Sequence, residues 1–173
     1  LTFSMKEDTF EVTIKSESDE VSLQGLNGLD FPRLPEADDI QTIKLPLEVM
    51  AKAVDNVLFA ASTDELKPAM NGMLFDFKPE GAIFVATDAH RLVRYRRVDV
   101  TVPNPITFIV PQKALNLLRG SIDPNANRDI VIQYNDSNAF FRAENLLLVC
   151  SLIDQRYPDY GKIIRSNTPK KLF

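Results

Sequence analysis

Residues 42–58 read TIKLPLEVMAKAVDNVL, a strand-like run that passes through a proline directly into a helical pattern. Pro46 suits the first turn of a helix, because the N–H that proline lacks would have no partner there. The apolar residues that follow recur at helical spacing and predict one buried stripe, formed by Leu47, Met50, Val54, Leu58 and Ala61. We therefore expect a strand at 42–45 and a helix that ends near Ser62.

The same order of elements recurs later in the chain. The expected strands are 73–78, 82–86, 92–100 and 106–110, and then, after a second helix, 129–134, 139–143 and 145–152. Pro111 opens the second helix about 65 residues after Pro46, as an internal repeat requires. Chance alternation of polar and apolar residues is the alternative source of this pattern. Two β-α-β-β-β units predict an α+β fold in which two helices pack on antiparallel sheets.

The polar side of the second helix differs in charge from that of the first. Ala114, Leu117 and Leu118 are expected to form its apolar side, whereas Lys113 and Arg119 lie on a polar side that has no acidic residue. This helix is therefore the better candidate for a positively charged surface.

The N-terminal region predicts a small sheet and a linker. Period-two alternation in residues 10–14 and 21–24 indicates two antiparallel strands. Residues 29–39 contain two prolines and an acidic cluster, which disfavour both a helix and a central strand. Because the chain starts at Leu1 in what already reads as a strand, we expect that it was cut from a longer protein.

Composition excludes several classes of protein. The chain has 45% hydrophobic and 25% charged residues, as soluble globular proteins do. Without a signal-peptide pattern or an apolar run near the roughly 20 residues that span a bilayer, it is expected to be cytoplasmic. One cysteine, Cys150, and one histidine cannot build a disulfide or a usual structural zinc site, so no metal or cofactor is expected. A formal charge of −4 means that any contact with DNA must be local.

Five segments carry a resemblance to a known family. The strongest is VATDAHRLV at 85–93, which is similar to the signature ATDGHRL. The others, in chain order, are DFPRLP at 30–35, LKPAMNGMLF at 66–75, IVPQKAL at 109–115 and LIDQRYPDY at 152–160. Together they resemble, in the right order, motifs of the bacterial DNA polymerase sliding clamp, the beta subunit of DNA polymerase III.

The resemblance covers essentially the whole chain and implies a DNA-clamp fold. In that fold each domain has two β-α-β-β-β units, with antiparallel sheets outside and two helices on the inner face. Residues 1–39 resemble the end of clamp domain 1 with its linker, 40–164 all of domain 2, and 165–173 the start of domain 3. Family subunits close head to tail into a homodimer ring, which this chain would lack the parts to close.

The implied function is that of a processivity factor in DNA replication. Such a clamp encircles double-stranded DNA without sequence specificity and catalyses nothing itself, so no catalytic residue is expected. The residues expected to face the DNA are Lys44, Lys52, Lys113 and Arg119. Ordinary solvated helix faces are the alternative interpretation of these residues.

The resemblance also implies a pocket for short peptides of the replicative polymerase, the clamp loader and repair proteins. Its expected residues in this chain are Met70, Thr87, Ala89, His90, Arg91, Leu92, Pro158 and Ile163. The apolar members would accept aliphatic or aromatic anchors, with His90 and Arg91 at the polar rim. Because the remaining wall belongs to the third domain, we expect this chain alone to bind such peptides poorly.

Three positions depart from the family's motifs. Ala89 stands where glycine is usual, Gln155 replaces a glycine, and Arg165 falls where proline is common. All three are expected in turns, and a non-glycine residue at positive φ costs about 1 kcal/mol, which the fold can absorb.

Other functions stay open on sequence alone. Thr87, Asp88 and His90 could suggest a hydrolytic triad, although residues so close in sequence rarely converge. An aromatic platform for single-stranded nucleic acid could form around Tyr95 with its neighbours Arg91, Arg94, Arg96 and Arg97, which could equally just solubilise an edge strand. The competing overall reading is a generic nucleic-acid-binding or protein-interaction α+β domain.

Overall fold

The structure is a computed structural model that describes residues 1–35 and 39–164, except for the side chain of Ile163. The chain divides into two compact units, residues 1–35 and residues 36–173. The segment 165–173, expected to begin a third domain, lies outside the described residues, as does Arg165.

The first unit is an antiparallel meander. Its strands pair in the order β1-β2-β3, and their bounds are β1 (Thr2–Met5), β2 (Glu11–Lys15) and β3 (Glu20–Gln24). The two strands expected at 10–14 and 21–24 are thereby confirmed. The register lines up the apolar residues on one face, in the rows Phe3, Ile14, Val21 and Met5, Val12, Leu23. A turn of 3-10 helix, η1 (Gly28–Asp30), begins the predicted linker.

The second unit repeats one order of elements. The first copy contains β4 (Gln41–Pro46), α1 (Leu47–Val57), η2 (Leu58–Ala60), η3 (Pro68–Met70), β5 (Gly72–Lys78), β6 (Gly81–Thr87) and β7 (Leu92–Arg97). The second copy contains β8 (Ile106–Pro111), α2 (Gln112–Ser121), β9 (Asp129–Tyr134), β10 (Asn138–Ala143) and β11 (Leu146–Ser151), and a short helix follows, α3 (Tyr160–Ile163). The tandem repeat and the α+β class are thus confirmed.

Each copy gives its first strand to the sheet of the other copy. The sheets have the orders β11-β10-β9-β4 and β7-β6-β5-β8, and all neighbours are antiparallel. Ile43 of β4 lies opposite Ile132 of β9, and Phe108 of β8 lies opposite Phe75 of β5. The two copies therefore build their sheets jointly.

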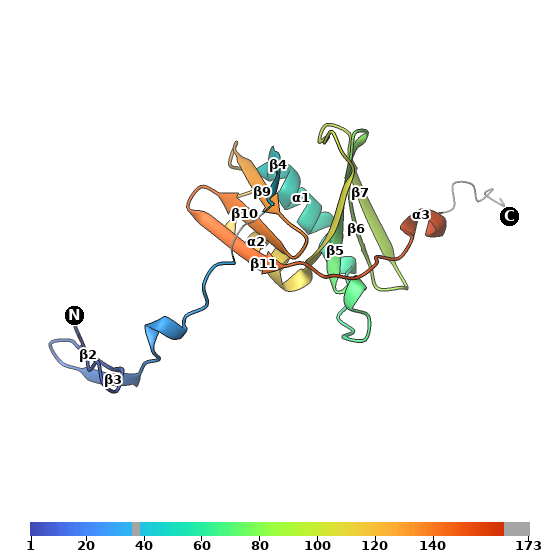
Figure 1. The fold of residues 1–173 in the computed structure, drawn as a ribbon. Coiled ribbons are helices and arrows are strands. Elements are labelled where there is room, and N and C mark those ends of the chain that lie inside the picture. The colour runs from blue at the N-terminus through green and yellow to red at the C-terminus, as the bar shows by residue number, and fades with distance from the viewer. Residues whose placement is uncertain (36–38, 165–173) are drawn as a thin grey trace. The chain divides into compact units, whose positions relative to one another are not determined.

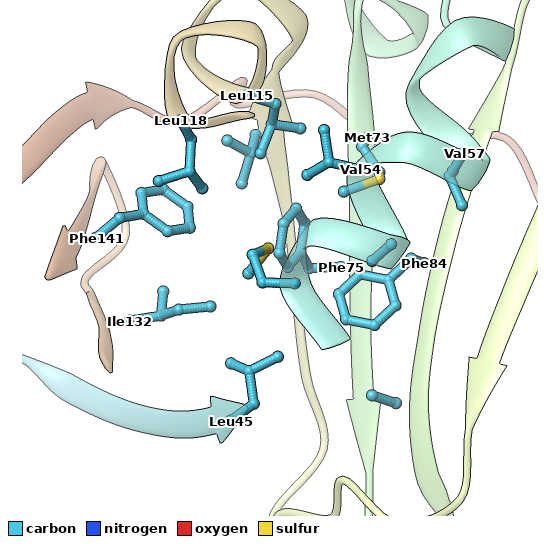
Figure 2. Packing of buried hydrophobic residues seen from close by; sticks show 14 of the residues in the cluster. Leu45, Val54, Val57, Met73, Phe75, Phe84, Leu115, Leu118, Ile132 and Phe141 are labelled. Carbon is cyan, nitrogen blue, oxygen red and sulfur yellow. The ribbon is translucent and has the colours of Figure 1, made fainter. Parts of the chain in front are cut away.

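One hydrophobic core joins the two helices to both sheets (Figure 1). Figure 2 shows the converging side chains, which include Val54 from α1, Leu115 and Leu118 from α2, Phe75 from β5, Ile132 from β9 and Phe141 from β10. The ring of Phe75 stacks on that of Phe108 with centroids 5.2 Å apart. The helices also meet at an ion pair, in which Arg119 Nε lies 2.6 Å from Asp55 Oδ1.

The predicted stripe of the first helix is confirmed, since all five of its residues are buried. The expected end near Ser62 is wrong, because α1 stops at Val57 and the chain continues as the 3-10 turn η2. The strand expected at 92–100 is also shorter, since β7 ends at Arg97.

The predicted apolar side of the second helix is partly wrong. Ala114 and Leu118 are buried as expected, but Leu117 is 57% exposed and Leu115 is completely buried in its place. Successive helical residues are rotated by about 100°, so the buried arc is centred between Leu115 and Leu118 and leaves Leu117 outside it.

Two leucines of α2 therefore make a matched test of the packing. Leu115→Ala should lower the free energy of unfolding by about 2–5 kcal/mol, because it leaves a cavity among the buried side chains. Leu117→Ala removes the same atoms from an exposed site and should change it by less than about 0.5 kcal/mol. Urea unfolding followed by circular dichroism measures both, and equal losses would contradict the helix orientation.

Candidate functional site

The turn between β6 and β7 is held by its own polar side chains. The hydroxyl of buried Thr87 donates to the carbonyl oxygen of Arg91 at 2.8 Å and accepts from Ala89 N at 3.2 Å. Asp88 Oδ1 accepts from the backbone N–H groups of His90 at 3.0 Å and Arg91 at 2.9 Å. Such side-chain bonds to nearby backbone stabilise a tight turn, so Thr87 and Asp88 fix the shape on which the neighbouring residues are displayed.

Ala89 takes the backbone conformation expected of a glycine, with φ of 78°. The cost of about 1 kcal/mol for an alanine there is offset by the hydrogen bonds of the turn. Gln155 also lies in a bend, as expected, but the expected positive φ is wrong, because Gln155 is not among the described residues with positive φ. Its N–H donates instead to the carbonyl oxygen of Ile153 at 3.0 Å.

Arg91 is held in place although its side chain is exposed. Its Nε lies 2.9 Å from Asp88 Oδ2, and its Nη2 donates to the carbonyl oxygen of Phe59 at 2.9 Å. The guanidinium carbon also lies 5.7 Å from the centroid of the Phe59 ring, within the range of a cation–π contact. Arg91, His90 and Phe59 line a cavity of about 360 Å³.

Phe59 is a site residue that the sequence interpretation missed. It is 57% exposed, and it follows the helix without belonging to the apolar stripe. The sequence offered one signal for Phe59, a large aromatic residue that lies outside the apolar stripe of the helix. Its contact with Arg91 could not be foreseen, because the two residues are far apart in the chain.

The other predicted pocket residues lie around a second surface. Leu74, Val85 and Ile109 point away from the main core, and the partly buried Leu92, Tyr157 and Tyr160 pack against them. Pro158 lines a cavity of about 470 Å³ on this side, together with Tyr157 and Tyr160.

The predicted peptide residues are therefore only partly brought together. His90 and Arg91 line one cavity and Pro158 the other, while half-buried Met70 in η3 lines neither. Thr87 supports the turn, and Leu92 begins β7 on the surface with Tyr157. The side chain of Ile163 lies outside the described residues.

The predicted DNA-facing residues do not form one set. Lys52 lies on α1 and pairs with Glu48, whereas Arg119 on α2 pairs with Asp55. The expectation that no carboxylate offsets the second helix is thus wrong for Arg119. Lys113 is exposed at the start of α2, and no ion pair joins it to another residue of the described ranges. Lys44 points away from the core side of β4 and pairs with Asp129 at 3.0 Å.

The geometry does not support the two rival readings of this region. Asp88 binds backbone N–H groups and Arg91, and the Thr87 hydroxyl donates to a carbonyl oxygen, so neither is arranged as in a triad. Tyr95 packs toward Phe84 with ring centroids 6.3 Å apart, whereas Arg94 and Arg96 are exposed. Arg97 lies beside Tyr95, since its Nη1 donates to the tyrosine hydroxyl at 3.2 Å, but it is half-buried and also pairs with Asp99. Tyr95 and the exposed arginines therefore do not share a platform.

Two further searches covered only the described part of the chain. No group of three or more His, Cys, Asp or Glu residues there is arranged to hold a metal ion. No helix in those ranges has the length and apolarity needed to cross a membrane.

Known proteins resemble this chain in sequence and in fold. Residues 44–159 match the family described as DNA polymerase III beta subunit, central domain. A beta sliding clamp of Bacillus subtilis (strain 168) is 29% identical over 161 residues, which make up 92% of this chain and 42% of that protein. A beta sliding clamp of Halalkalibacterium halodurans is 32% identical over 157 residues, or 88% of this chain and 40% of that protein.

Solved structures agree with these sequence matches. The crystal structure of the DNA polymerase sliding clamp from Bacillus subtilis has a TM-score of 0.83 and 25% identity, and the match covers 95% of this chain and 43% of that one. A putative DNA polymerase III beta subunit from Eubacterium rectale has a TM-score of 0.84 at 22% identity, which supports the fold. This chain spans less than half the length of these relatives.

The 87–91 turn should loosen in acid. Backbone hydrogen bonds from Arg91 and His90 hold the pKa of Asp88 below its usual range. A lowered folded-state pKa stabilises the turn above the unfolded value of about 3.9, and this contribution is lost as pH falls through the lower folded-state value. An NMR titration of the Asp88 carboxyl carbon should therefore have its midpoint below about 3.9.

The matching control is Asp88→Asn, whose amide oxygen can accept the same two N–H bonds without titrating. The protection factors of the His90 and Arg91 amides, which correct for the intrinsic slowing of exchange in acid, should fall in acid more for the original chain than for this variant. A midpoint for Asp88 at or above the free value would contradict the assigned hydrogen bonds.

Proposed function

The chain belongs to the DNA polymerase III beta subunit family, and we propose that it serves in a sliding clamp, the ring that keeps a polymerase on double-stranded DNA. The observation that carries this proposal is the tandem repeat whose two helices pack side by side against two antiparallel sheets. In this proposal residues 1–39 end the first clamp domain, 40–164 form the second, and 165–173 begin the third. The complete protein would be a cytoplasmic homodimer ring that catalyses no reaction itself.

A ring of this kind needs no reading of bases. Sequence-independent sliding requires weak contacts between basic side chains and phosphates, while the closed ring prevents dissociation. Lys113 is the strongest candidate for such a contact, because it is exposed on α2 and has no ion-pair partner in the described ranges. Lys52 and Arg119 would contribute less, since each already pairs with a carboxylate. Lys44 is the weakest candidate, because it points to the opposite side of β4 from the core.

This ranking can be tested by the salt dependence of binding to a short duplex. The slope of log K against log salt is negative, and removing one phosphate contact should make it less negative by about 0.9. We expect a change of that order for Lys113→Gln, a smaller one for Lys52→Gln and none for Lys15→Gln, whose lysine lies on a strand and already pairs with Glu20. Fluorescence anisotropy with two unrelated duplexes provides the measurement, and different affinities for the two would contradict sequence-independent binding.

We further propose that the surface around the 87–92 turn captures short peptides of the replicative polymerase, the clamp loader and repair proteins. Met70, Leu92, Pro158 and Ile163 would accept aliphatic or aromatic anchors, while His90 and Arg91 form the polar rim. The fixed geometry of Arg91 supports this role, because a side chain that is already ordered loses less entropy on binding.

Peptide binding should weaken when either kind of contact is removed. Arg91→Ala and Met70→Ala are each expected to lower affinity about fivefold to thirtyfold, which is typical of losing one substantial interface side chain. The probe is a six-residue peptide with one leucine and one phenylalanine, titrated in large excess and followed by NMR, because the chain without its third domain is expected to bind it weakly. Arg142→Ala is the control, since Arg142 binds Gln133 in the other sheet.

Thermal melting separates binding from folding in this experiment. Both site variants should melt near the original chain, and a collapse of the fold would assign Arg91 or Met70 a structural role instead. Binding to oligonucleotides without any binding of the peptide would favour a generic nucleic-acid-binding domain.

A further inference from the structure

A strap formed by residues 152–160 crosses the face of the β7-β6-β5-β8 sheet that points away from the main core (Figure 1). It leaves β11 with a hydrogen bond from Leu152 N to the carbonyl oxygen of Ser137 at 2.7 Å. Ile153 N then donates to the carbonyl oxygen of Ile109 in β8 at 3.0 Å, and the strap ends where α3 begins. Between these points it has no regular secondary structure, so side chains must fix its course.

Asp76 anchors the strap from below. This residue lies in β5, is only 4% exposed, and faces the strap because its neighbours Phe75 and Phe77 point into the main core. A buried carboxylate needs partners to offset its lost hydration. Asp76 has three of them: the Lys78 ammonium at 2.9 Å, the Thr107 hydroxyl at 3.4 Å and the Tyr160 hydroxyl at 2.5 Å.

Of the three hydrogen bonds to Asp76, the one from Tyr160 is the shortest, and Tyr160 is the only one of the three partners that belongs to the strap. Burial and the hydrogen bond to Asp76 raise the pKa of Tyr160 above its usual range, so its hydroxyl stays protonated and donates at neutral pH. Hydrogen bonds to a charged partner are roughly twice as strong as those between neutral groups. This bond therefore ties the end of the strap to the middle of β5.

Tyr157 is a second residue that holds the strap against the sheet, near the candidate peptide site. Its hydroxyl donates to the carbonyl oxygen of Val85 at 3.4 Å, two residues before Thr87. Tyr157 thus connects the strap to the end of β6 where the 87–92 turn begins. Pro158 follows Tyr157 directly, so the position of Pro158 depends on how the strap is seated.

We propose that Tyr160 and Asp76 are positioning residues for peptide capture: their hydrogen bond seats the strap, and the seated strap holds Pro158 in the cavity that it lines with Tyr157 and Tyr160. This inference rests on the proposed function, because it assigns a role in the peptide pocket. Asp76 lines the same cavity as Pro158 but is only 4% exposed, so we assign its effect on a bound peptide to the strap bond rather than to a direct contact.

The test removes the hydroxyl and leaves the ring in place. Tyr160→Phe should weaken binding of the six-residue leucine and phenylalanine peptide about threefold to tenfold, which is less than the loss of a direct hydrogen bond to a charged group, because the effect reaches the peptide only through the strap. Amide hydrogen exchange within residues 152–160 should also become faster. Tyr134→Phe is the matched control, because Tyr134 donates a bond of 2.6 Å to Gln41 in the other sheet and should leave both measurements unchanged.

A second variant tests the coupling between the two residues. Asp76→Asn keeps an acceptor oxygen but not the charge, so the strap bond becomes weaker. Because both substitutions remove the same bond, the second should add little to the first. The loss of peptide affinity in the combined variant Tyr160→Phe/Asp76→Asn should therefore be smaller than the product of the two separate fold-losses.

The outcomes separate this inference from the function on which it rests. If neither the original chain nor the chain with its third domain restored binds the peptide, the proposed pocket is wrong and the inference fails with it. If the original chain binds and Tyr160→Phe behaves like Tyr134→Phe, only the inference is overturned. Faster exchange in the strap with unchanged peptide affinity would also overturn it, because the strap would then not position the site.

Discussion

The fold of the second unit depends on the exchange of one strand between the two halves of its repeat. The meanders β5-β6-β7 and β9-β10-β11 each gain a fourth strand from the other copy, and that strand then forms one edge of the sheet. β8 covers the edge of β5 and β4 covers the edge of β9. Because β4 lies in one sheet and β5 in the other, α1 must bridge the two sheets, and α2 does the same between β8 and β9. The helices are thereby brought together, as the ion pair of Asp55 and Arg119 shows.

Aromatic packing stabilises the arrangement that the strand exchange creates. Phe75 contacts Phe84 and Phe108 within its own sheet, and its ring also lies 6.5 Å from that of Phe141 in the other sheet. Phe108 stacks on Tyr134 with centroids 4.9 Å apart, which again joins the two sheets. The core is therefore shared between the halves, and a large loss at one of these rings should destabilise both.

Much of the fold follows from periodicity, and the errors arise where tertiary contacts decide. The stripe of α1 and most strands were predictable because alternation and helical spacing reflect burial on one side. The burial of Leu115 instead of Leu117 in α2 was not predictable, because helical spacing alone does not say which residue lies at the centre of the buried side. At the site, the hydrogen bonds of Asp88 are local and its turn was foreseeable. The contacts of Arg91 with Phe59 and of Asp76 with Tyr160 join distant parts of the sequence, so no local sequence pattern predicts them.

Pro46 and Pro111 give the repeat an additional mechanical property. Each is the last residue of a strand and also caps the helix that follows, so no loop separates β4 from α1 or β8 from α2. Proline restricts its own backbone rotation, and the flanking residues are committed to a sheet ladder on one side and a helix on the other. A joint of this kind has almost no freedom to pivot. A force applied across α1 or α2 is consequently transmitted directly to a sheet. The pair of helices is therefore rigid relative to the two sheets.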